Sequence, residues 1–595
     1  MHNARFRQKD WKRLSALQAK GHHILEKIQR HIPKKTYNLT QSDFEKGTFR
    51  ITKPGKYILK ENITFAPNPK NDFRPLSTQR DYAGRPFSLG FFAAITIEVD
   101  GVEIDLNRKT LRQSDKMAWM QRFYANIETA STAFISGQGP GKFGKSILSP
   151  KYIYIHNGTL GRSSHHGIHG NGNQYVLIEN VVMVDYEFVG SAINGGTYIV
   201  HRNCKILHNF KDLKVLATWS AALFALQFSD AIAKNVSDTS NMDAGLFNEF
   251  SHSHLRLRAS IRKAKKELFA NRIVSNDLFR NEKKLADGNV YGILTNPLGV
   301  AIHAFASKQS MKELPPASHF FVENCEIQDL EGDVDEVVGF VNKNKKAQKG
   351  LSGDLLKLAD CTYEDGSYRS NEISDMIFSL AAIQRTYPTW DYGTLHIDTD
   401  VLRWSHGELS FAQLTERGYL FQTGQDSMGH TGKGVLGIRI DGTNNVVLAN
   451  NTVKNITNHA RLGAEFNKST DKTYLGTITA GIHVAYSRGV WIEKTLIENI
   501  RSYNGEASGI KGINTSKLFL HQSSVRDIES GLQYKEGEWT GRNYNKRSSI
   551  YRSTQPNEFP SVKGVCWSHD STVYFEDIQI ETLKGPQVFY VAIIE

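Results

Sequence analysis

One stretch of twenty residues, Gly437–Ile456, constrains the fold of this chain more than any other part of the sequence. It reads GIRIDGTNNVVLANNTVKNI, and its apolar residues alternate at a period of two: Ile438 and Ile440, then Val446 and Leu448. This alternation is typical of half-buried β-strands. Asn pairs after the strands favour left-handed corner conformations. A unit this short cannot bury its own apolar face, so it must stack on copies of itself.

Copies of this unit recur along the chain. Positions equivalent to Val446 are Ile104, Ile153, Val176, Ile199, Phe320, Val490, Leu518 and Val573. Seven of these nine positions, Val446 included, have Gly nine residues earlier, at Gly144, Gly167, Gly190, Gly437, Gly481, Gly509 and Gly564. Ile153, Val176 and Ile199 are 23 residues apart, which suits a coil of three strands and three corners. The sequence therefore predicts a right-handed parallel β-helix, with a pair of β-sandwiches as the competing architecture.

Two gaps of more than 120 residues between copies are too long for corners and predict inserted substructures. The predicted organisation is an arm or cap helix over 1–35, β-helix over 36–206, a partly helical insert over 207–316, one rung over 317–330, a second insert over 331–433 and β-helix again over 434–595. Helices are expected within the inserts at Val215–Phe228, Leu255–Leu285 and Glu372–Tyr387.

Several rungs resemble a known superfamily. GVEIDLNRKTL, GIRIDGTNNVVLANNTVKNI and GIHVAYSRGVWIEKTLIENI resemble rungs of the pectin-lyase-like β-helix superfamily, which contains polysaccharide lyases, hydrolases, epimerases and tailspikes. GKYILKENITF, SSHHGIHGNGN and DSMGHTGKGVLGIRIDG are similar to uncharacterised β-helix proteins of large DNA viruses and protists. The resemblance implies a fold and supplies no catalytic residues.

Charge is concentrated at the N-terminus. Residues 1–35 hold ten Lys or Arg and two acids, so they contribute +8 of the net +12 and leave +4 for the other 560 residues. A basic arm is weak evidence for a nucleic-acid-binding body, so nucleic acid is not the expected partner. Trp11, Leu14, Leu17 and Ile28 are among apolar residues at helical spacing. The arm is either a membrane or nucleic-acid segment or, preferably, a helix that closes the open first rung.

The start of the chain, MHNARFRQKDWKRL, has no apolar signal core. This predicts synthesis in the cytoplasm, with incorporation into a virion under the structural alternative. No apolar stretch is long enough to predict a transmembrane segment. The four cysteines lack C-x-x-C spacing and are interpreted as reduced, packed thiols.

Outward-facing positions on the rung strands indicate a candidate site. If Ile438 and Ile440 point inward, Arg439 points outward, and the equivalent residues of the next rungs are His483 and Lys511. Rungs lie about 4.8 Å apart, so these three residues would form a cationic or titratable row, with Asp441 orienting Arg439. Such a row suits an acidic polysaccharide. The alternative is a solvated face whose outward residues happen to be basic.

A second candidate is SSHHGIHG, with His165, His166 and His169. Three imidazoles within five residues can hold a divalent transition metal, but the spacing lacks a nearby carboxylate or Cys, so support for a metal is weak and no cofactor is predicted. Asp426, His430 and Lys433 form a similar corner before Gly434. The two corners could line one groove.

Function follows from the residues present and absent. The outward positions lack the carboxylate pair that glycoside hydrolysis requires, so the expected chemistry is β-elimination or epimerisation at a uronate. Lys511, with a lowered pKa, would act as the base, Arg439 would neutralise the substrate carboxylate, and His483 or His169 would return the proton. The alternatives are a structural or attachment rod, for example a virion trimer, and a nucleic-acid binder that uses the arm.

Overall fold

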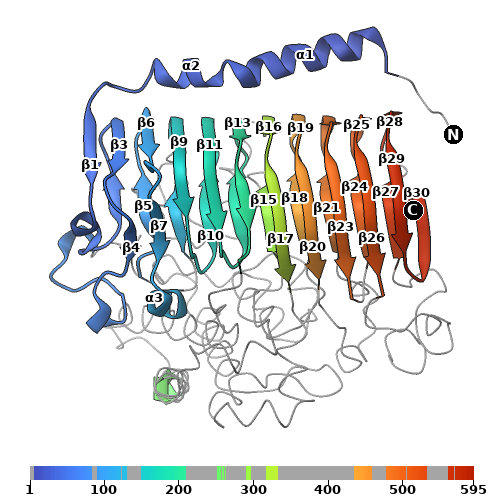
Figure 1. Cartoon of the computed structure of the whole chain (residues 1–595). Helices are drawn as coiled ribbons and strands as arrows, with labels where there is room; N and C mark the ends of the chain where they lie inside the picture. The colour runs from blue at the N-terminus through green and yellow to red at the C-terminus, as the bar shows by residue number, and fades with distance from the viewer. Residues whose placement is uncertain are drawn as a thin grey trace, which may run out of the picture.

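The structure, a computed structural model, describes residues 6–82, 87, 90–121, 124–129, 149–209, 251–252, 254–255, 258–259, 262, 290–296, 317–332, 434–458, 478–503, 506–531, 561–568 and 570–594. These residues form a right-handed parallel β-helix (Figure 1). Ile438, Ile482, Ile510 and Val565 are fully buried in one core, which confirms the β-helix over the pair of β-sandwiches. The expected helices of the inserts, the second insert itself and the corner with Asp426, His430 and Lys433 lie largely or wholly outside the described residues.

All strand pairings within the two sheets are parallel. Sheet B contains one strand from each coil: β2 Phe49–Ile51, β5 Ala93–Ile97, β8 Ala125–Glu128, β10 His166–Asn171, β12 Val189–Asn194, β15 Val290–Thr295, β18 Val435–Asp441, β21 Ile478–Ala485, β24 Glu506–Ile513, β27 Ser561–Ser568 and β30 Gln587–Ile594. After its strand in sheet B, each coil continues into sheet A. For example, β18 in sheet B is followed along the chain by β19 and β20 in sheet A.

Sheet A comprises the remaining strands. They are β1 Thr36–Leu39, β3 Gly55–Leu59, β4 Ile63–Phe65, β6 Val102–Asp105, β7 Thr110–Gln113, β9 Lys151–Leu160, β11 Gln174–Val184, β13 Thr197–Arg202, β14 Lys205–Leu207, β16 Ser318–Glu323, β17 Glu326–Gly332, β19 Asn444–Ala449, β20 Thr452–Asn458, β22 Arg488–Glu493, β23 Leu496–Ser502, β25 Ser516–His521, β26 Ser524–Ser530, β28 Val573–Glu576 and β29 Gln579–Lys584. Short helices η1 Gln41–Phe44, η2 Pro69–Asn71, η3 Arg80–Tyr82 and α3 Asp115–Met120 lie between strands.

Corner and close-approach residues explain the repeated Asn and Gly. Asn445, Asn450 and Asn455 adopt φ values of 56°, 55° and 55°, which confirms the left-handed corners. Gly437 serves a different purpose, because a Cβ there would lie 2.3 Å from Val453 Cγ1 and 2.6 Å from a backbone oxygen of the next coil. The recurrent Gly thus lets neighbouring coils and the two sheets approach closely.

One coil interrupts the aliphatic core with a polar pair. Along sheet B, Ser191 lies between Ile168 and Ile293 in the register, and His201 lies between Ile178 and Val322 in sheet A. Both side chains are fully buried, and Ser191 Oγ is 2.8 Å from His201 Nε2. The consecutive strands β12 and β13 therefore each place one polar side chain where neighbouring coils have an aliphatic one, and the two polar side chains satisfy each other by a hydrogen bond.

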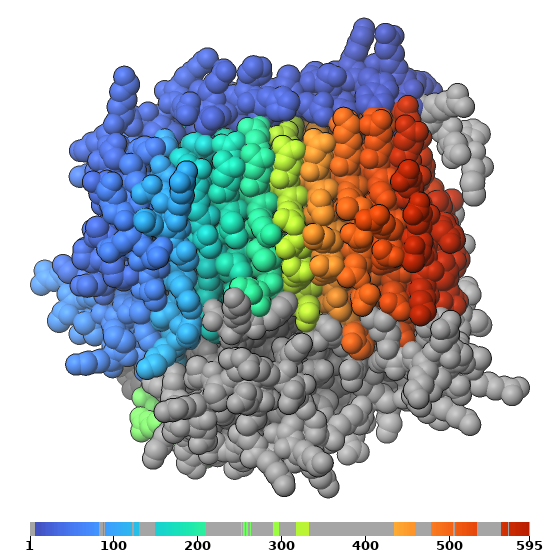
Figure 2. Space-filling model, in the orientation of Figure 1, coloured from blue at the N-terminus to red at the C-terminus, as the bar shows by residue number. Residues whose placement is uncertain are grey.

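The basic arm forms α1 Gln8–His22 and α2 Ile24–Gln29, as its apolar spacing predicted. It lies lengthwise across the outer face of sheet A, from β9 and β11 to β25 and β28 (Figures 1 and 2). Leu14, Leu17 and Ile28 pack against outward apolar side chains of sheet A that include Phe321 and Trp491. The expectation that this helix closes the first rung is wrong, because its docking surface is the row of apolar residues on the side of the coils.

The predicted insert over 207–316 requires a correction. It contains β15, which pairs with β12 and β18 in sheet B. Ile293 is paired with Ile438, which places Gly292 beside Gly437. The repeat was hidden because 22 residues separate Thr295 from β16 at Ser318, whereas two residues separate β18 from β19.

Candidate functional site

A single outward row runs along sheet B. The register places in this row Arg50, Thr96, Glu128, His169, Ala192, Leu294, Arg439, His483, Lys511, Cys566 and Ala592. Arg439, His483 and Lys511 lie directly opposite one another on the consecutive strands β18, β21 and β24. Their predicted adjacency is confirmed, and their catalytic roles remain predictions.

Arg439 is the centre of a hydrogen-bonded network. Its Nε donates to Asp441 Oδ2 at 2.8 Å, its Nη2 lies 2.7 Å from the same oxygen, and its Nη1 donates to Tyr291 Oη at 3.0 Å. Asp441 lies two residues along the same strand, so the two side chains project from one face. Burial opposes the charge of Arg439, but Tyr291 and Asp441 outweigh it and raise its pKa. The predicted orienting role of Asp441 agrees with this geometry.

His483 lies beside the same carboxylate. Its Nδ1 is 3.6 Å from Asp441 Oδ1, and neither atom has a hydrogen-bond partner among the described residues. Burial lowers the pKa of His483 despite the opposing effect of Asp441, so the imidazole is neutral near pH 7. Burial alone would raise the pKa of Asp441, but His483 and Arg439 lower it. A neutral imidazole thus faces an ionised carboxylate, which is a suitable arrangement for a general base.

Lys511 is held in an ion-pair cluster. Its Nζ donates to Glu506 Oε1 at 2.7 Å, and Lys563 Nζ donates to Glu506 Oε2 at 2.7 Å. Burial would lower the pKa of Lys511, but the charge of Glu506 dominates and raises it. The expected lowered pKa of Lys511 is therefore wrong, because the neighbour that determines its charge state is a carboxylate and not another cation. A lysine that remains protonated is a poor base.

His169 lies far from this network. Its Nδ1 is 2.9 Å from Glu128 Oε1 on β8. Four strand-to-strand steps along sheet B separate β10 from β21, which amounts to roughly 19 Å at the usual spacing. His169 therefore cannot return a proton to a sugar held at His483.

The three predicted imidazoles do gather. His165 Nδ1 lies 2.7 Å from His166 Nδ1, and the rings of His166 and His169 are 4.8 Å apart. Burial lowers the pKa of His166 well below its usual value. Within the described ranges, however, the one group with three converging ligand atoms is Glu103, Asp105 and His156 on sheet A. A metal at the histidine corner stays a weakly supported expectation.

Sequence reasoning missed Tyr291, Glu506 and Glu128. Tyr291 lies on β15, inside the segment taken for an insert. Glu506 begins β24 and reaches Lys511, five residues later; the alternation of the strand offers only a weak signal for that contact. Glu128 has Asn126 two residues before it, where the other rungs have Gly, and 22 residues separate it from β9 at Lys151, so its strand did not match the repeat.

A cavity of about 560 Å³ lies between the N-terminal helices and sheet A, and none of its lining residues belongs to sheet B. Tyr175 and Tyr198 line it beneath Lys27, whose Nζ donates to Tyr175 Oη at 2.7 Å. The rings of Tyr152, Tyr175 and Tyr198 stack on one another at 5.2 and 4.9 Å. Lys27 Nζ lies 4.0 Å from the centroid of the Tyr175 ring, so an ammonium already occupies this wall of the cavity.

Three cysteines, Cys204, Cys325 and Cys566, are buried free thiols, as expected. Cys361 lies outside the described residues. Over the same described part of the chain, none of the helices is both long and apolar enough for a membrane span.

Comparison with known proteins gives distant structural likenesses. No family model and no curated protein matches the chain. A mannuronan C-5 epimerase A-module of Azotobacter vinelandii is 8% identical, with 94% of this chain and 89% of that chain covered and a TM-score of 0.29. An alginate lyase of Paenibacillus is 8% identical, with 93% and 98% covered and a TM-score of 0.30. A surface protein and adhesin of Streptococcus pneumoniae is 8% identical, with 97% and 96% covered and a TM-score of 0.28. Likenesses this distant assign no substrate and no catalytic residue.

Proposed function

We propose that this chain binds an acidic polysaccharide along sheet B and transfers a proton at a uronate, as a lyase or an epimerase does. The observation that carries the proposal is the network of Tyr291, Arg439, Asp441 and His483, which joins three consecutive strands. It combines a fixed cation, a neutral imidazole and a phenol on one face. The cation can neutralise the substrate carboxylate, the imidazole can take the neighbouring proton and the phenol can donate one.

Arg439 would hold the substrate carboxylate. A guanidinium carries five N–H groups, and the contacts to Asp441 and Tyr291 use one on each nitrogen, so two remain for an anion. The Arg439 side chain retains 32% exposure. When the C5–H bond breaks, its electrons move into the substrate carboxylate. The positive charge of Arg439 neutralises the added negative charge and so stabilises the enolate-like intermediate.

His483 would take the C5 proton, replacing Lys511 in the role of base. Asp441 faces Nδ1 and leaves Nε2 for the substrate, and the carboxylate stabilises the imidazolium that forms. Tyr291 would supply a proton, because burial raises the pKa of its phenol and keeps it protonated. In elimination the C4–O bond breaks and the phenol protonates the departing oxygen. In epimerisation the phenol instead donates a proton to C5 from the opposite face, and the electrons of the intermediate form the new C5–H bond.

Lys511 and Lys563 would attract the polymer. With Glu506 between them, two ammonium groups and one carboxylate carry a net charge of +1 close to His483. Positive charge along a polysaccharide path raises the local concentration of an acidic chain. This assigns Lys511 a binding role.

The test uses the full chain with polymannuronate, polygalacturonate and glycosaminoglycans. Unsaturated product is followed by ultraviolet absorbance, and epimerisation by deuterium uptake from solvent at C5. His483→Gln should lower kcat by roughly 100-fold or more, the usual contribution of a general base, and Tyr291→Phe should lower it as well.

Arg439→Lys should raise KM and lower kcat, because Lys cannot reproduce the forked contacts. A matched control is Arg202→Lys on sheet A, where Arg202 binds Glu323 at 3.1 Å; this variant should retain activity. No turnover on any acidic polysaccharide, or turnover that survives His483→Gln, would overturn the proposal. Release of saturated reducing ends would indicate hydrolysis and would also contradict it.

A second function, a structural rod that assembles through its end, is favoured by the last strand. Phe589, Tyr590, Val591 and Ile593 of β30 are 42%, 54%, 44% and 50% exposed. Among the described strands β30 pairs with β27 alone, and large apolar side chains this exposed at a sheet edge are an association surface. A second copy of this chain would cover them. The measurement is molar mass by light scattering for the wild-type chain and for Val591→Lys; a monomer in both would contradict this function.

A further inference from the structure

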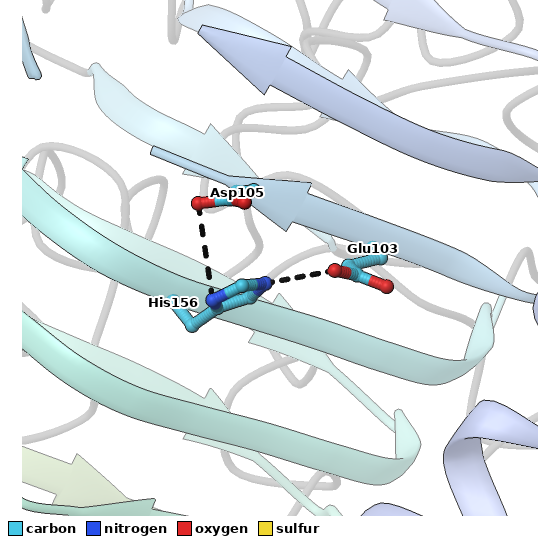
Figure 3. Close-up of side chains that lie close together, drawn as sticks. All are labelled: Glu103, Asp105 and His156. Carbon is cyan, nitrogen blue, oxygen red and sulfur yellow. Dashed lines mark hydrogen bonds and ion pairs between the residues drawn. The ribbon is translucent and has the colours of Figure 1, made fainter. Parts of the chain in front are cut away.

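A cluster on sheet A, unrelated to the sheet B site, has the composition of a metal centre. Glu103 and Asp105 alternate on β6 and project from the same face, and the register places His156 of β9 directly beside Asp105. One ligand atom from each residue lies within 4.8 Å of the other two. Figure 3 shows the imidazole directed between the two carboxylates.

The two nitrogens of His156 have different surroundings. Nε2 is 2.9 Å from Glu103 Oε1, so an Nε2–H donates to that carboxylate. Nδ1 then carries a lone pair; it is buried, has no hydrogen-bond partner within the described part of the chain, and lies 3.9 Å from Asp105 Oδ1. His156 is only 5% exposed, and its ring is held by stacking on Tyr154 with centroids 4.1 Å apart.

This arrangement matches the way proteins prepare a histidine ligand. A metal-binding imidazole usually donates its other N–H to a carboxylate, which fixes the ring and its tautomer. A buried lone pair without a donor loses hydration and gains nothing in return. Two zinc ligands at about 2.0–2.1 Å in tetrahedral geometry are about 3.3 Å apart, so closing the Nδ1–Oδ1 separation needs a shift of about half an ångström.

Lys56 pairs with both carboxylates. Its Nζ is 2.8 Å from Glu103 Oε1 and 3.3 Å from Asp105 Oδ2. The Lys56 side chain is 32% exposed, and its flexible stem lets the ammonium swing into water. Two carboxylates thus face a single ammonium, which leaves room for a cation beside them.

We propose that Glu103, Asp105 and His156 form a site for a divalent transition metal of the zinc class, which displaces the ammonium of Lys56. His156 Nδ1 and an Asp105 oxygen are the direct ligands, and Glu103 acts as the positioning residue through Nε2–H. Water completes the coordination. The mixed nitrogen and oxygen ligands suit Zn²⁺ better than Ca²⁺ or Mg²⁺, which prefer oxygen alone.

The experiment is calorimetric titration of the full chain with ZnCl₂, with MgCl₂ as the comparison ion. Other histidines bind some zinc, so the readout is the difference between variants. His156→Gln and Asp105→Asn should each remove one zinc from the stoichiometry. Glu103→Gln should weaken the same site by roughly tenfold, as loss of a supporting carboxylate does. Lys56→Met should bind zinc more tightly than wild type, because no ammonium competes.

A matched control is His521→Gln. His521 lies on the same outward face of sheet A with Nδ1 3.6 Å from Glu493 Oε1, yet no three-atom ligand group forms there among the described residues. This variant should bind zinc like wild type. A purely structural charge cluster predicts lower stability in Lys56→Met without tighter zinc binding. That result, or unchanged stoichiometry in both His156→Gln and a folded Asp105→Asn, would overturn the proposal, and neither outcome bears on the sheet B activity.

Discussion

The buried pair of Ser191 and His201 allows a quantitative test of how the core is held together. Ser191→Ala removes the hydroxyl 2.8 Å from His201 Nε2 and leaves a polar nitrogen unpaired in an aliphatic core. This should lower the free energy of unfolding by about 1–3 kcal/mol. The double variant Ser191→Ala, His201→Leu replaces both polar partners by apolar groups of similar size and should be nearly neutral or stabilising.

The same pair predicts a pH dependence with a definite sign. Burial lowers the pKa of His201 from 6.5 to about 3. Between these values the unfolded chain binds a proton that the folded chain does not, so stability falls as pH decreases through this window. The full shift corresponds to about 4–5 kcal/mol at 1.36 kcal/mol per pKa unit. Above pH 6.5 the contribution is fully present, and it is lost progressively toward pH 3.

The assay is urea unfolding of the full chain, followed by far-ultraviolet circular dichroism above and below pH 6.5. Carboxylates titrate in the same acid range, so the informative quantity is wild type minus the double variant. That difference should be near zero or negative above pH 6.5 and should become more negative, by up to about 4–5 kcal/mol, as the pH falls toward 3. If Ser191→Ala costs less than about 0.5 kcal/mol, the size of an ordinary surface substitution, or if the double variant keeps the full acid sensitivity, the reasoning is refuted.

Three further predictions concern the coils and the row on sheet B. Gly481→Ala should cost about 1–3 kcal/mol by overpacking, because its Cβ would lie 2.4 Å from a core isoleucine methyl, whereas Gly434→Ala, with its nearest neighbour at 3.4 Å, should be nearly neutral in the same urea assay. Trp491→Ala should cost about 3–5 kcal/mol and expose the N-terminal helices to limited proteolysis; helices that stay protected would contradict their docking on this ring. Glu506→Gln should cost about 3–5 kcal/mol, because it leaves two lysines without their buried partner. The lysines lower the pKa of Glu506 against burial, so wild type should lose this advantage as pH falls below 4.5, and a pH-independent difference between the two would count against the ion pairs.

The fold was predictable because its signal is periodic. Alternating residues such as Ile438 and Ile440, and Gly at a fixed distance, report the coil directly, since a parallel coil brings equivalent positions of successive repeats together. The prediction failed where spacing changed, at β15. It also failed for the N-terminal helices, because amphipathic spacing reports that a face is covered and does not report which surface covers it.

For the site, only the order of residues along the outward row of sheet B was predictable from the sequence. Alternation gave the outward row, so Arg439, His483 and Lys511 could be placed on neighbouring strands. Their charge states depended on side chains outside that row, such as Glu506 beside Lys511. Electrostatic partners five residues away or on an unrecognised strand carry no periodic signal.

The path of the N-terminal helices has a consequence for biosynthesis. Phe6 packs on Phe519 with ring centroids 5.2 Å apart, and Tyr574 packs against the same cluster. The helix α1 is synthesised before all the coils on which it docks, and its docking surface is complete only after residue 574 has been synthesised. A nascent chain must therefore carry an amphipathic segment with an uncovered apolar face while more than 500 residues of coil are translated. Docking of that segment requires the late coils, because a chain truncated before β25 lacks the aromatic side chains that receive it.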